Sequence, residues 1–154
     1  MACGITVIPT ISAGVAYASG DAVGGRLEFE DARTPYSSVG KILRAVIKDR
    51  AKQNAHLFLV LFNKEFTATA DNSAFTVSDS DLLHCLGGLE FTAANYVSFH
   101  DNSIAELGLF GLDVEESFIL ESSGTTLYGQ LMVQTSTPTY VATTDLAVSL
   151  LIGD

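Results

Sequence analysis

Short apolar and β-branched runs recur along the whole chain, and Gly, Asp, Asn, Ser or Pro separates each run from the next. Runs of this length and spacing are typical of antiparallel strands joined by turns, not of strands that alternate with long helices. We therefore expect an all-β antiparallel β-sandwich or jelly-roll-like fold. Its strands are predicted at residues 5–11, 23–30, 40–50, 56–63, 89–92, 96–99, 103–110, 115–121, 125–134 and 145–152.

Residues 40–50 fit both a strand and a helix. As a strand they turn Leu43, Ala45 and Ile47 toward the core and their basic residues toward solvent, whereas as a helix their apolar residues form one stripe. The run is short and dense in β-branched residues, which favours the strand. Residues 49–54 then form a hairpin tip that leads into 56–63, and that nearly all-apolar run indicates a strand buried on both faces.

One short helix is predicted near residues 79–86. Ser78 is a suitable N-cap, and Asp79 and Asp81 complement the positive end of the helix dipole. The pair Gly87–Gly88 is expected to end the helix.

A chain of 154 residues corresponds to about one domain, so we expect a single β-sandwich domain over residues 1–154. Only 17% of the residues are charged, which leaves much of the surface to Ser, Thr and Gly or to other subunits. The sequence shows neither a membrane-spanning run nor a signal peptide. Its two cysteines form no disulfide framework, and synthesis in a reducing host cytoplasm is expected.

Charge is distributed unevenly along the chain. All eight Lys and Arg residues lie between Arg26 and Lys64, and 13 of the 18 carboxylates follow Lys64. A strongly acidic surface repels nucleic acid and anionic membranes, so neither is an expected partner. The basic stretch is instead a candidate for an electrostatic contact between subunits, or a set of charges that blunts an exposed strand. Its residues are Arg44, Lys48, Arg50 and Lys52.

A catalytic triad is the first chemistry that the sequence invites, because Ser98, His100 and Asp101 lie close together. Working triads draw their members from separate elements held within hydrogen-bond reach, and no Gly-x-Ser-x-Gly elbow occurs here. A polar strand end that runs into a turn explains these residues better. We predict that the protein is not an enzyme.

Metal binding is the second chemistry that the sequence suggests. His84 and Cys85 are adjacent, with Cys3 and His56 elsewhere, but no Cys-x-x-Cys or His-x-x-x-His spacing is present. The segment Asp79-Ser-Asp81 begins like a calcium loop and lacks the glycine and glutamate that complete one. No metal or cofactor is expected.

Three parts of the chain carry a resemblance to a known class of protein. They are a Gly/Ala/Ser/Thr-rich start (Ile5–Ile11 and Gly14–Gly25), one apolar central strand (Leu57–Asn63) and a Thr-rich end (Thr126–Met132, Thr137–Tyr140 and Asp145–Val148). With these features, the chain resembles small all-β virion proteins of tailed bacteriophages over almost its whole length. A head decoration (cement) protein is the best match within that class.

The resemblance implies a structural protein on the outer surface of the capsid. Its partners would be the major capsid protein and other copies of itself, commonly as a homotrimer on local threefold positions, and it would stiffen the shell. Residues 1–10 are then a candidate N-terminal arm, with Ile5, Val7, Ile8 and Pro9 as candidate capsid contacts, since a free terminal strand can extend a neighbour's sheet. The alternative is an ordinary edge strand of its own domain.

Other functions fit the same fold. The protein could serve as a neck or tail accessory protein of the particle, or as a receptor-binding or carbohydrate-binding module. Sugar recognition relies on exposed aromatic residues, and this chain has no Trp but five Tyr. The number of copies per particle separates these functions from decoration.

Overall fold

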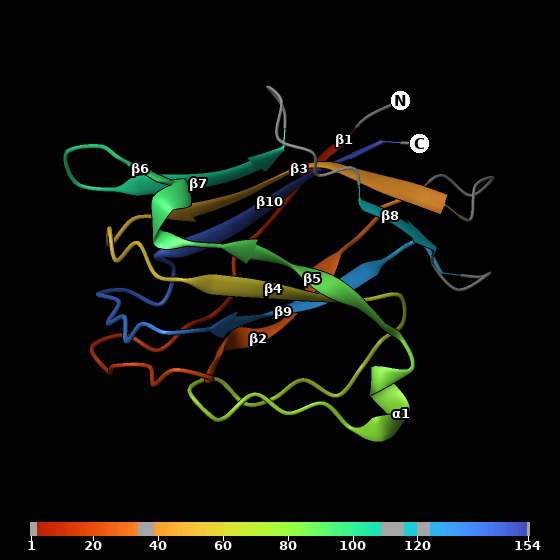
Figure 1. Ribbon diagram of the computed structural model, residues 1–154, viewed down its shortest axis with the longest axis horizontal. Coiled ribbons are helices and arrows are strands. Elements are labelled where there is room, and N and C mark those ends of the chain that lie inside the picture. The colour runs from red at the N-terminus through yellow and green to blue at the C-terminus, as the bar shows by residue number, and fades with distance from the viewer. Residues whose placement is uncertain (1–2, 34–38, 109–115, 120–123, 154) are drawn as a thin grey trace.

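Antiparallel pairing joins the strands of this protein into two sheets (Figure 1). The computed structural model describes residues 3–33, 39–108, 116–119 and 124–153. The larger sheet has the strand order β1 (Cys3–Val7), β10 (Leu146–Gly153), β3 (Val39–Asp49), β7 (Ser103–Gly108) and β6 (Tyr96–Ser98), with β8 (Glu116–Ile119) paired to the first residues of β3. The smaller sheet has the order β2 (Ala22–Phe29), β9 (Leu127–Val133), β4 (Leu57–Phe62) and β5 (Cys85–Phe91).

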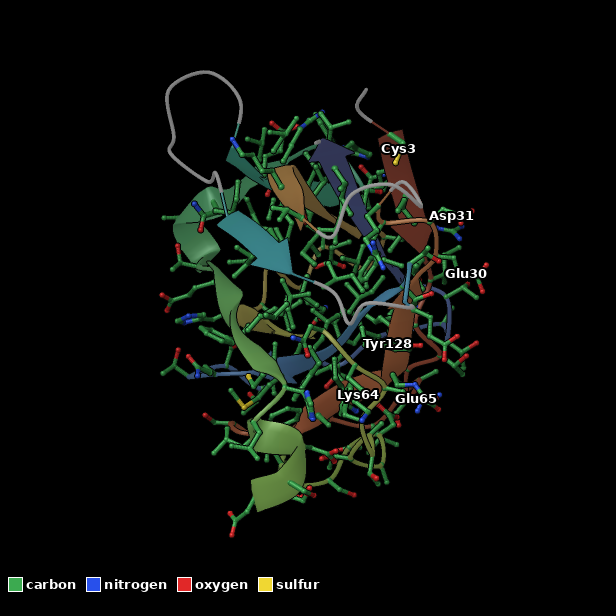
Figure 2. All side chains as sticks on the ribbon, turned by 90° about the vertical axis from the view of Figure 1, so that its right-hand side faces the viewer. Cys3, Glu30, Asp31, Lys64, Glu65 and Tyr128 are labelled. Carbon is green, nitrogen blue, oxygen red and sulfur yellow. The ribbon has the colours of Figure 1, made fainter. Side chains whose placement is uncertain are left out.

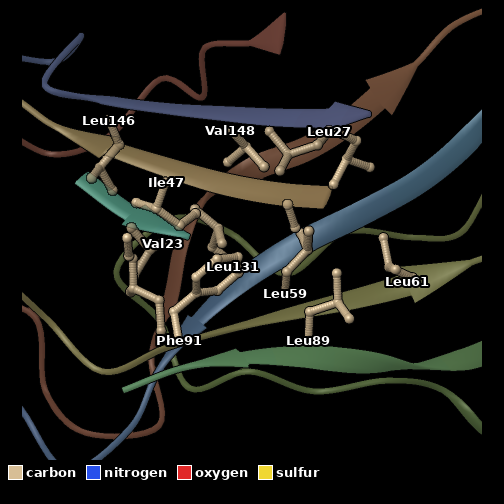
Figure 3. Packing of buried hydrophobic residues seen from close by; sticks show 14 of the residues in the cluster. Val23, Leu27, Ile47, Leu59, Leu61, Leu89, Phe91, Leu131, Leu146 and Val148 are labelled. Atoms are coloured by element: carbon tan, nitrogen blue, oxygen red, sulfur yellow. The ribbon is translucent and has the colours of Figure 1, made fainter. Parts of the chain in front are cut away.

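The two sheets pack face to face around an apolar core (Figure 3). Ile47 and Val148 point inward from the larger sheet, and Leu59 and Leu131 point toward them from the smaller sheet. All four side chains are fully buried. Burial of each such side chain stabilises the fold by roughly 1.5–3 kcal/mol. The predicted all-β sandwich is confirmed.

Strand β4 is buried on both faces, as its apolar sequence predicts. Its odd-numbered residues enter the core between the sheets. On the outer face, Val60 and Phe62 are covered by the segment 63–78, from which Phe66 stacks on Phe62 with 3.9 Å between ring centroids. This segment therefore closes the outer face of the smaller sheet.

Residues 39–49 form a strand, and its alternation changes phase at a bulge. Ile42 pairs with Ile152 and Arg44 pairs with Leu151, which leaves Leu43 as the extra residue. Ile42 is consequently fully buried in the core, while Leu43 is only half-buried. The prediction that Leu43 faces the core is wrong, because the bulge interrupts the alternation of the strand. Ile42, on the other side of the bulge, faces the core in its place. Ala45 and Ile47 do face the core.

Residues 49–54 do not form a hairpin, and this corrects the sequence interpretation. Strand β3 belongs to the larger sheet and β4 to the smaller one, so the loop crosses from sheet to sheet. The carboxylate of Asp49, which is 1% exposed, accepts backbone N–H bonds from Ala51 (3.0 Å) and Asn54 (3.0 Å). An aspartate that collects loop N–H groups in this way stabilises a tight loop as a cap stabilises a helix end.

The helix α1 (Asp79–Leu82) begins where the sequence predicts and is shorter than expected. The side chain of Ser78 accepts a bond from the Asp81 N–H, so the predicted N-cap is confirmed. Gly87 and Gly88 lie inside β5 and do not stop the helix. Gly88 is required there because Phe58 packs over it and the carbonyl oxygen of Leu59 lies only 2.6 Å from the position of a Cβ atom.

The first strand was predicted at 5–11 and instead spans residues 3–7, so residues 8–11 lie outside it; the other predicted elements fit with small changes at their ends. A short 3₁₀ helix, η1 (Ala93–Asn95), precedes β6. The strands predicted at 103–110 and 115–121 agree with β7 and β8, although residues 109–110, 115 and 120–121 lie outside the described part. The same holds for residues 34–38 of the loop predicted between the second and third strands.

Candidate functional site

The outer face of the larger sheet is the main candidate site. Register places three rows of side chains across it: Ala147, Lys48, Ile104 and Val97; then Thr6, Ser149, Val46 and Glu106; then Gly4, Leu151, Arg44 and Gly108. Each row places an apolar residue directly beside a charged one. No segment comparable to 63–78 covers this face among the described residues, so it is the less shielded side of the sandwich.

Two shallow grooves lie along this face. One, of about 290 Å³, lies where β3 ends beside the β6–β7 turn and is lined by Lys48, Arg50, Phe99 and Ile104, among others. A second, of about 250 Å³, runs between β1, β10 and β3 and has Arg44 and Lys48 on its border. Both grooves combine apolar surface with positive charge.

The four predicted basic contact residues fall into two groups. Arg44 forms an ion pair with Glu106 on β7, and Lys52 donates from Nζ to the carbonyl oxygens of Phe99 (2.9 Å) and His100 (3.4 Å). These two side chains are used within the chain. Lys48 and Arg50 are exposed and make no ion pair with the described residues. Only this second pair has its charge available to a partner.

Asp49 positions both available cations, because it lies between them in sequence and organises the loop. Desolvation by burial raises the pKa of its carboxyl above the usual value, and the loop N–H bonds oppose that shift. The backbone N–H of Arg50 also donates to the carbonyl oxygen of Asp145 (2.8 Å). Arg50 thus projects from a loop that is held on both sides.

The positive charge of Arg26, on the smaller sheet, is neutralised by nearby carboxylates. Arg26 on β2 pairs with Glu28 (2.9 Å) and Glu65 (2.9 Å) and lies 5.8 Å from the centre of the Tyr128 ring. Figure 2 shows Glu65 beside Tyr128 on this side of the molecule, with Glu30 and Asp31 further along the same edge. This edge is acidic and contrasts with the end of β3.

The candidate N-terminal contacts lie mostly inside the protein's own fold. Residues 3–7 form β1, which pairs with β10 along its length, so the edge-strand alternative applies to them. Ile5 and Val7 pack against the core, and Pro9 is buried. Ile8 is 57% exposed and is the one of the four that offers apolar surface to a partner.

The catalytic and metal interpretations gain no support from the geometry. The Ser98 hydroxyl accepts a bond from the Asn54 amide (3.2 Å), while the side chains of His100 and Asp101 are exposed and lie 3.5 Å from each other. In the segment that begins like a calcium loop, the carboxylate of Asp81 accepts the backbone N–H of Thr67 (3.1 Å). Within the described residues, no three groups suited to a metal ion cluster together, and no helix has the length and apolar character to cross a membrane.

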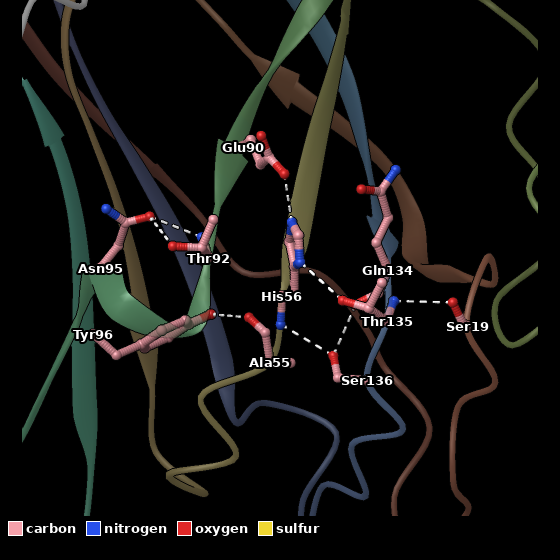
Figure 4. A network of polar contacts seen from close by, with 10 residues as sticks. All are labelled: Ser19, Ala55, His56, Glu90, Thr92, Asn95, Tyr96, Gln134, Thr135 and Ser136. Carbon is pink, nitrogen blue, oxygen red and sulfur yellow. Dashed lines mark hydrogen bonds and ion pairs between the residues drawn. The ribbon is translucent and has the colours of Figure 1, made fainter.

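His56 has a structural role that its sequence position does not reveal (Figure 4). Its Nε2 lies 2.7 Å from Glu90 Oε1 and its Nδ1 lies 3.0 Å from Thr135 Oγ1. The ring therefore links β4, β5 and the loop after β9. Tyr96 adds a bond to the carbonyl oxygen of Ala55 (2.7 Å), which ties β6 to the same loop region.

Sequence reasoning missed the apolar members of the site. Val97, Ile104 and Leu151 belong to predicted strands, but only the strand order brings them onto one face. Phe99 lies in the β6–β7 turn and is 56% exposed. An aromatic residue at a turn, between polar neighbours, was the one available signal.

Comparison with known proteins gives limited information. The sequence matches no protein-family model and no curated protein. Among solved structures, a chain from desmodium yellow mottle tymovirus is similar to this chain, with 13% sequence identity and a TM-score of 0.28. The similarity covers 99% of this chain and 79% of that chain. The all-β sandwich assignment rests on the strand pairing described above and not on this match.

Proposed function

We propose that this chain is a structural component of a virus particle, and more specifically a decoration protein bound to the outer surface of a tailed-phage capsid. The outer face of the larger sheet, which no segment of the described chain covers, carries the proposal. That face mixes apolar residues with Lys48 and Arg44, and a sheet face of this kind suits a lasting contact with another protein. The sequence resemblance to small virion proteins supports the same role.

The proposed partners are the major capsid protein and other copies of this chain, with a trimer as the expected oligomer. The low share of charged residues, 17%, favours permanent contact with neighbours over life as a free monomer. The net charge of −10 disfavours contact with packaged nucleic acid, which agrees with an outer position.

The number of copies per purified particle tests this function directly. Quantitative mass spectrometry is suitable, with a Glu-directed protease because trypsin leaves residues 65–154 as one peptide. A copy number comparable to that of the major capsid protein is expected. About a dozen copies or fewer would instead place the chain at the neck or tail, which are the low-copy parts of a particle. Absence from particles would refute the virion role and favour a receptor-binding or carbohydrate-binding module.

Ile8 is the proposed apolar contact of the N-terminal segment with the capsid. Ile8→Asp should weaken capsid binding about tenfold, because a buried aliphatic side chain contributes at least about 1.4 kcal/mol to an interface. Val141→Asp is the matched control, since Val141 is 81% exposed in a different loop. Equal capsid binding by both variants in a co-sedimentation assay would remove Ile8 from the interface.

A further inference from the structure

The helix α1 and Leu83, the residue that follows it, form an exposed patch of mixed character. Leu82 is 58% exposed and Leu83 is 84% exposed, and Asp79 lies three and four residues before them on the same side of the turn. No basic residue occupies the last turn of α1. We call Asp79, Leu82 and Leu83 the α1 patch. It is apolar with a negative border.

The groove at the end of β3 has the complementary character. Ile104 and the exposed Phe99 supply apolar lining, and Lys48 and Arg50 supply positive charge. We call these four residues the basic groove. Figure 1 shows α1 at the lower right and the β6–β7 turn, which borders the groove, at the upper left. The α1 patch of a chain therefore cannot reach that chain's own groove.

We propose that the α1 patch of one copy docks into the basic groove of the next copy. Leu82 and Leu83 would bury against Phe99 and Ile104, and Asp79 would lie near the two cations. Contact between like patches is disfavoured, because it would bring carboxylates against carboxylates or cations against cations. The contact is thus head-to-tail, and it builds either a closed ring or an open chain of copies.

This inference goes beyond the proposed function, since it concerns contact between copies and holds whether or not the chain binds a capsid. Particle copy number tests the virion role, and self-association of the purified protein tests this contact. Either can fail while the other stands.

Sedimentation velocity of the full chain at low salt measures the contact. Wild-type protein should associate, and Leu83→Ser and Arg50→Glu should each raise the Kd of self-association by about tenfold or more. Association should also weaken at high salt, because exposed charges are screened. Matched controls are Val141→Ser, an equally exposed apolar residue, and Lys41→Glu, the same charge change on β3 outside the groove. Both controls should associate like the wild type.

Mixing the two variants identifies the head-to-tail geometry. Leu83→Ser copies keep an intact groove and Arg50→Glu copies keep an intact α1 patch, so the mixture should form heterodimers that do not grow further. Circular dichroism and thermal unfolding confirm that both variants are folded. A mixture that stays monomeric, a wild type that is monomeric at every concentration, or variants that associate like the wild type would each overturn the proposal.

Discussion

Replacement of Gln130 with methionine tests how the segment 63–78 is held on the smaller sheet. The Gln130 side chain is fully buried and makes three bonds to backbone. Its Oε1 accepts the Thr69 N–H (3.0 Å), and its Nε2 donates to the carbonyl oxygens of Gly24 (2.9 Å) and Thr69 (2.6 Å). Methionine keeps the volume and removes all three bonds.

The expected loss in the free energy of unfolding follows from the fate of the three backbone groups. Thr69 is partly exposed, so its N–H and C=O can turn to water at about 0.5–1.5 kcal/mol each. Gly24 is buried, so its carbonyl remains without a partner and adds roughly 1–3 kcal/mol. The sum is about 2–6 kcal/mol, centred near 4 kcal/mol, and a loss of about 4 kcal/mol lowers Tm by about 8–16 °C for a chain of this size.

Urea unfolding and calorimetry measure this loss, with Gln134→Met as the control. Gln134 is half-buried and bonds only through its backbone: its N–H donates to the His56 carbonyl oxygen (2.8 Å) and its carbonyl oxygen accepts the Ser136 hydroxyl (3.1 Å). The control should therefore change stability by no more than about 0.5 kcal/mol. Trypsin adds a local readout, because Lys64 is the last site it can cleave and lies within the segment. Cleavage after Lys64 should be faster in Gln130→Met. Equal stability and equal cleavage in the two variants would refute the role given to Gln130.

Two further predictions concern Asp49 and Gly88. Burial raises the pKa of Asp49 above its usual 3.8, so the folded state holds its proton to higher pH and the unfolding free energy falls as pH rises through that window. The difference in unfolding free energy between the wild type and Asp49→Asn should therefore decrease as pH rises above about 4, and an increase would contradict this. Gly88→Ala should cost about 1–3 kcal/mol in urea unfolding because Phe58 occupies the space of the new methyl group, whereas Gly25→Ala, which meets no atom within 4 Å, should cost much less.

The strands were predictable because each carries its own local signal. Alternation, β-branched residues and turn residues identified the strand positions, and the unbroken apolar run 57–62 correctly indicated burial on both faces. The errors arose where the outcome depends on distant partners. Whether β4 pairs with β3 or with β9 is decided by which sheet each joins, and 49–54 reads as a turn in both cases. From sequence, Gly88 indicates the end of a helix, and only the packing of Phe58 against it explains why a glycine lies within β5.

The candidate site was predictable in charge and not in shape. The sequence alone showed that all positive residues lie between Arg26 and Lys64. The sequence could not show that Arg44 and Lys52 bind partners within the chain, because Glu106 and the β6–β7 carbonyls reach them only through the order β3–β7–β6. The apolar partners of the available cations come from that same order.

The two outer faces of the sandwich differ in a way that decides where a partner can bind. The smaller sheet uses segment 63–78 to cover its aromatic residues, and Gln130 and Phe66 hold that cover in place. The outer face of the larger sheet keeps the half-buried Ile104 and the exposed Val97 in one row with Lys48, a cation that no carboxylate of the described chain engages. A partner for that face must supply both apolar surface and negative charge, since a basic partner would face Lys48 and Arg50 and a wholly polar one would leave the apolar rows without cover. In a chain with 18 carboxylates and eight basic residues, the surface of another copy is one ready source of that combination.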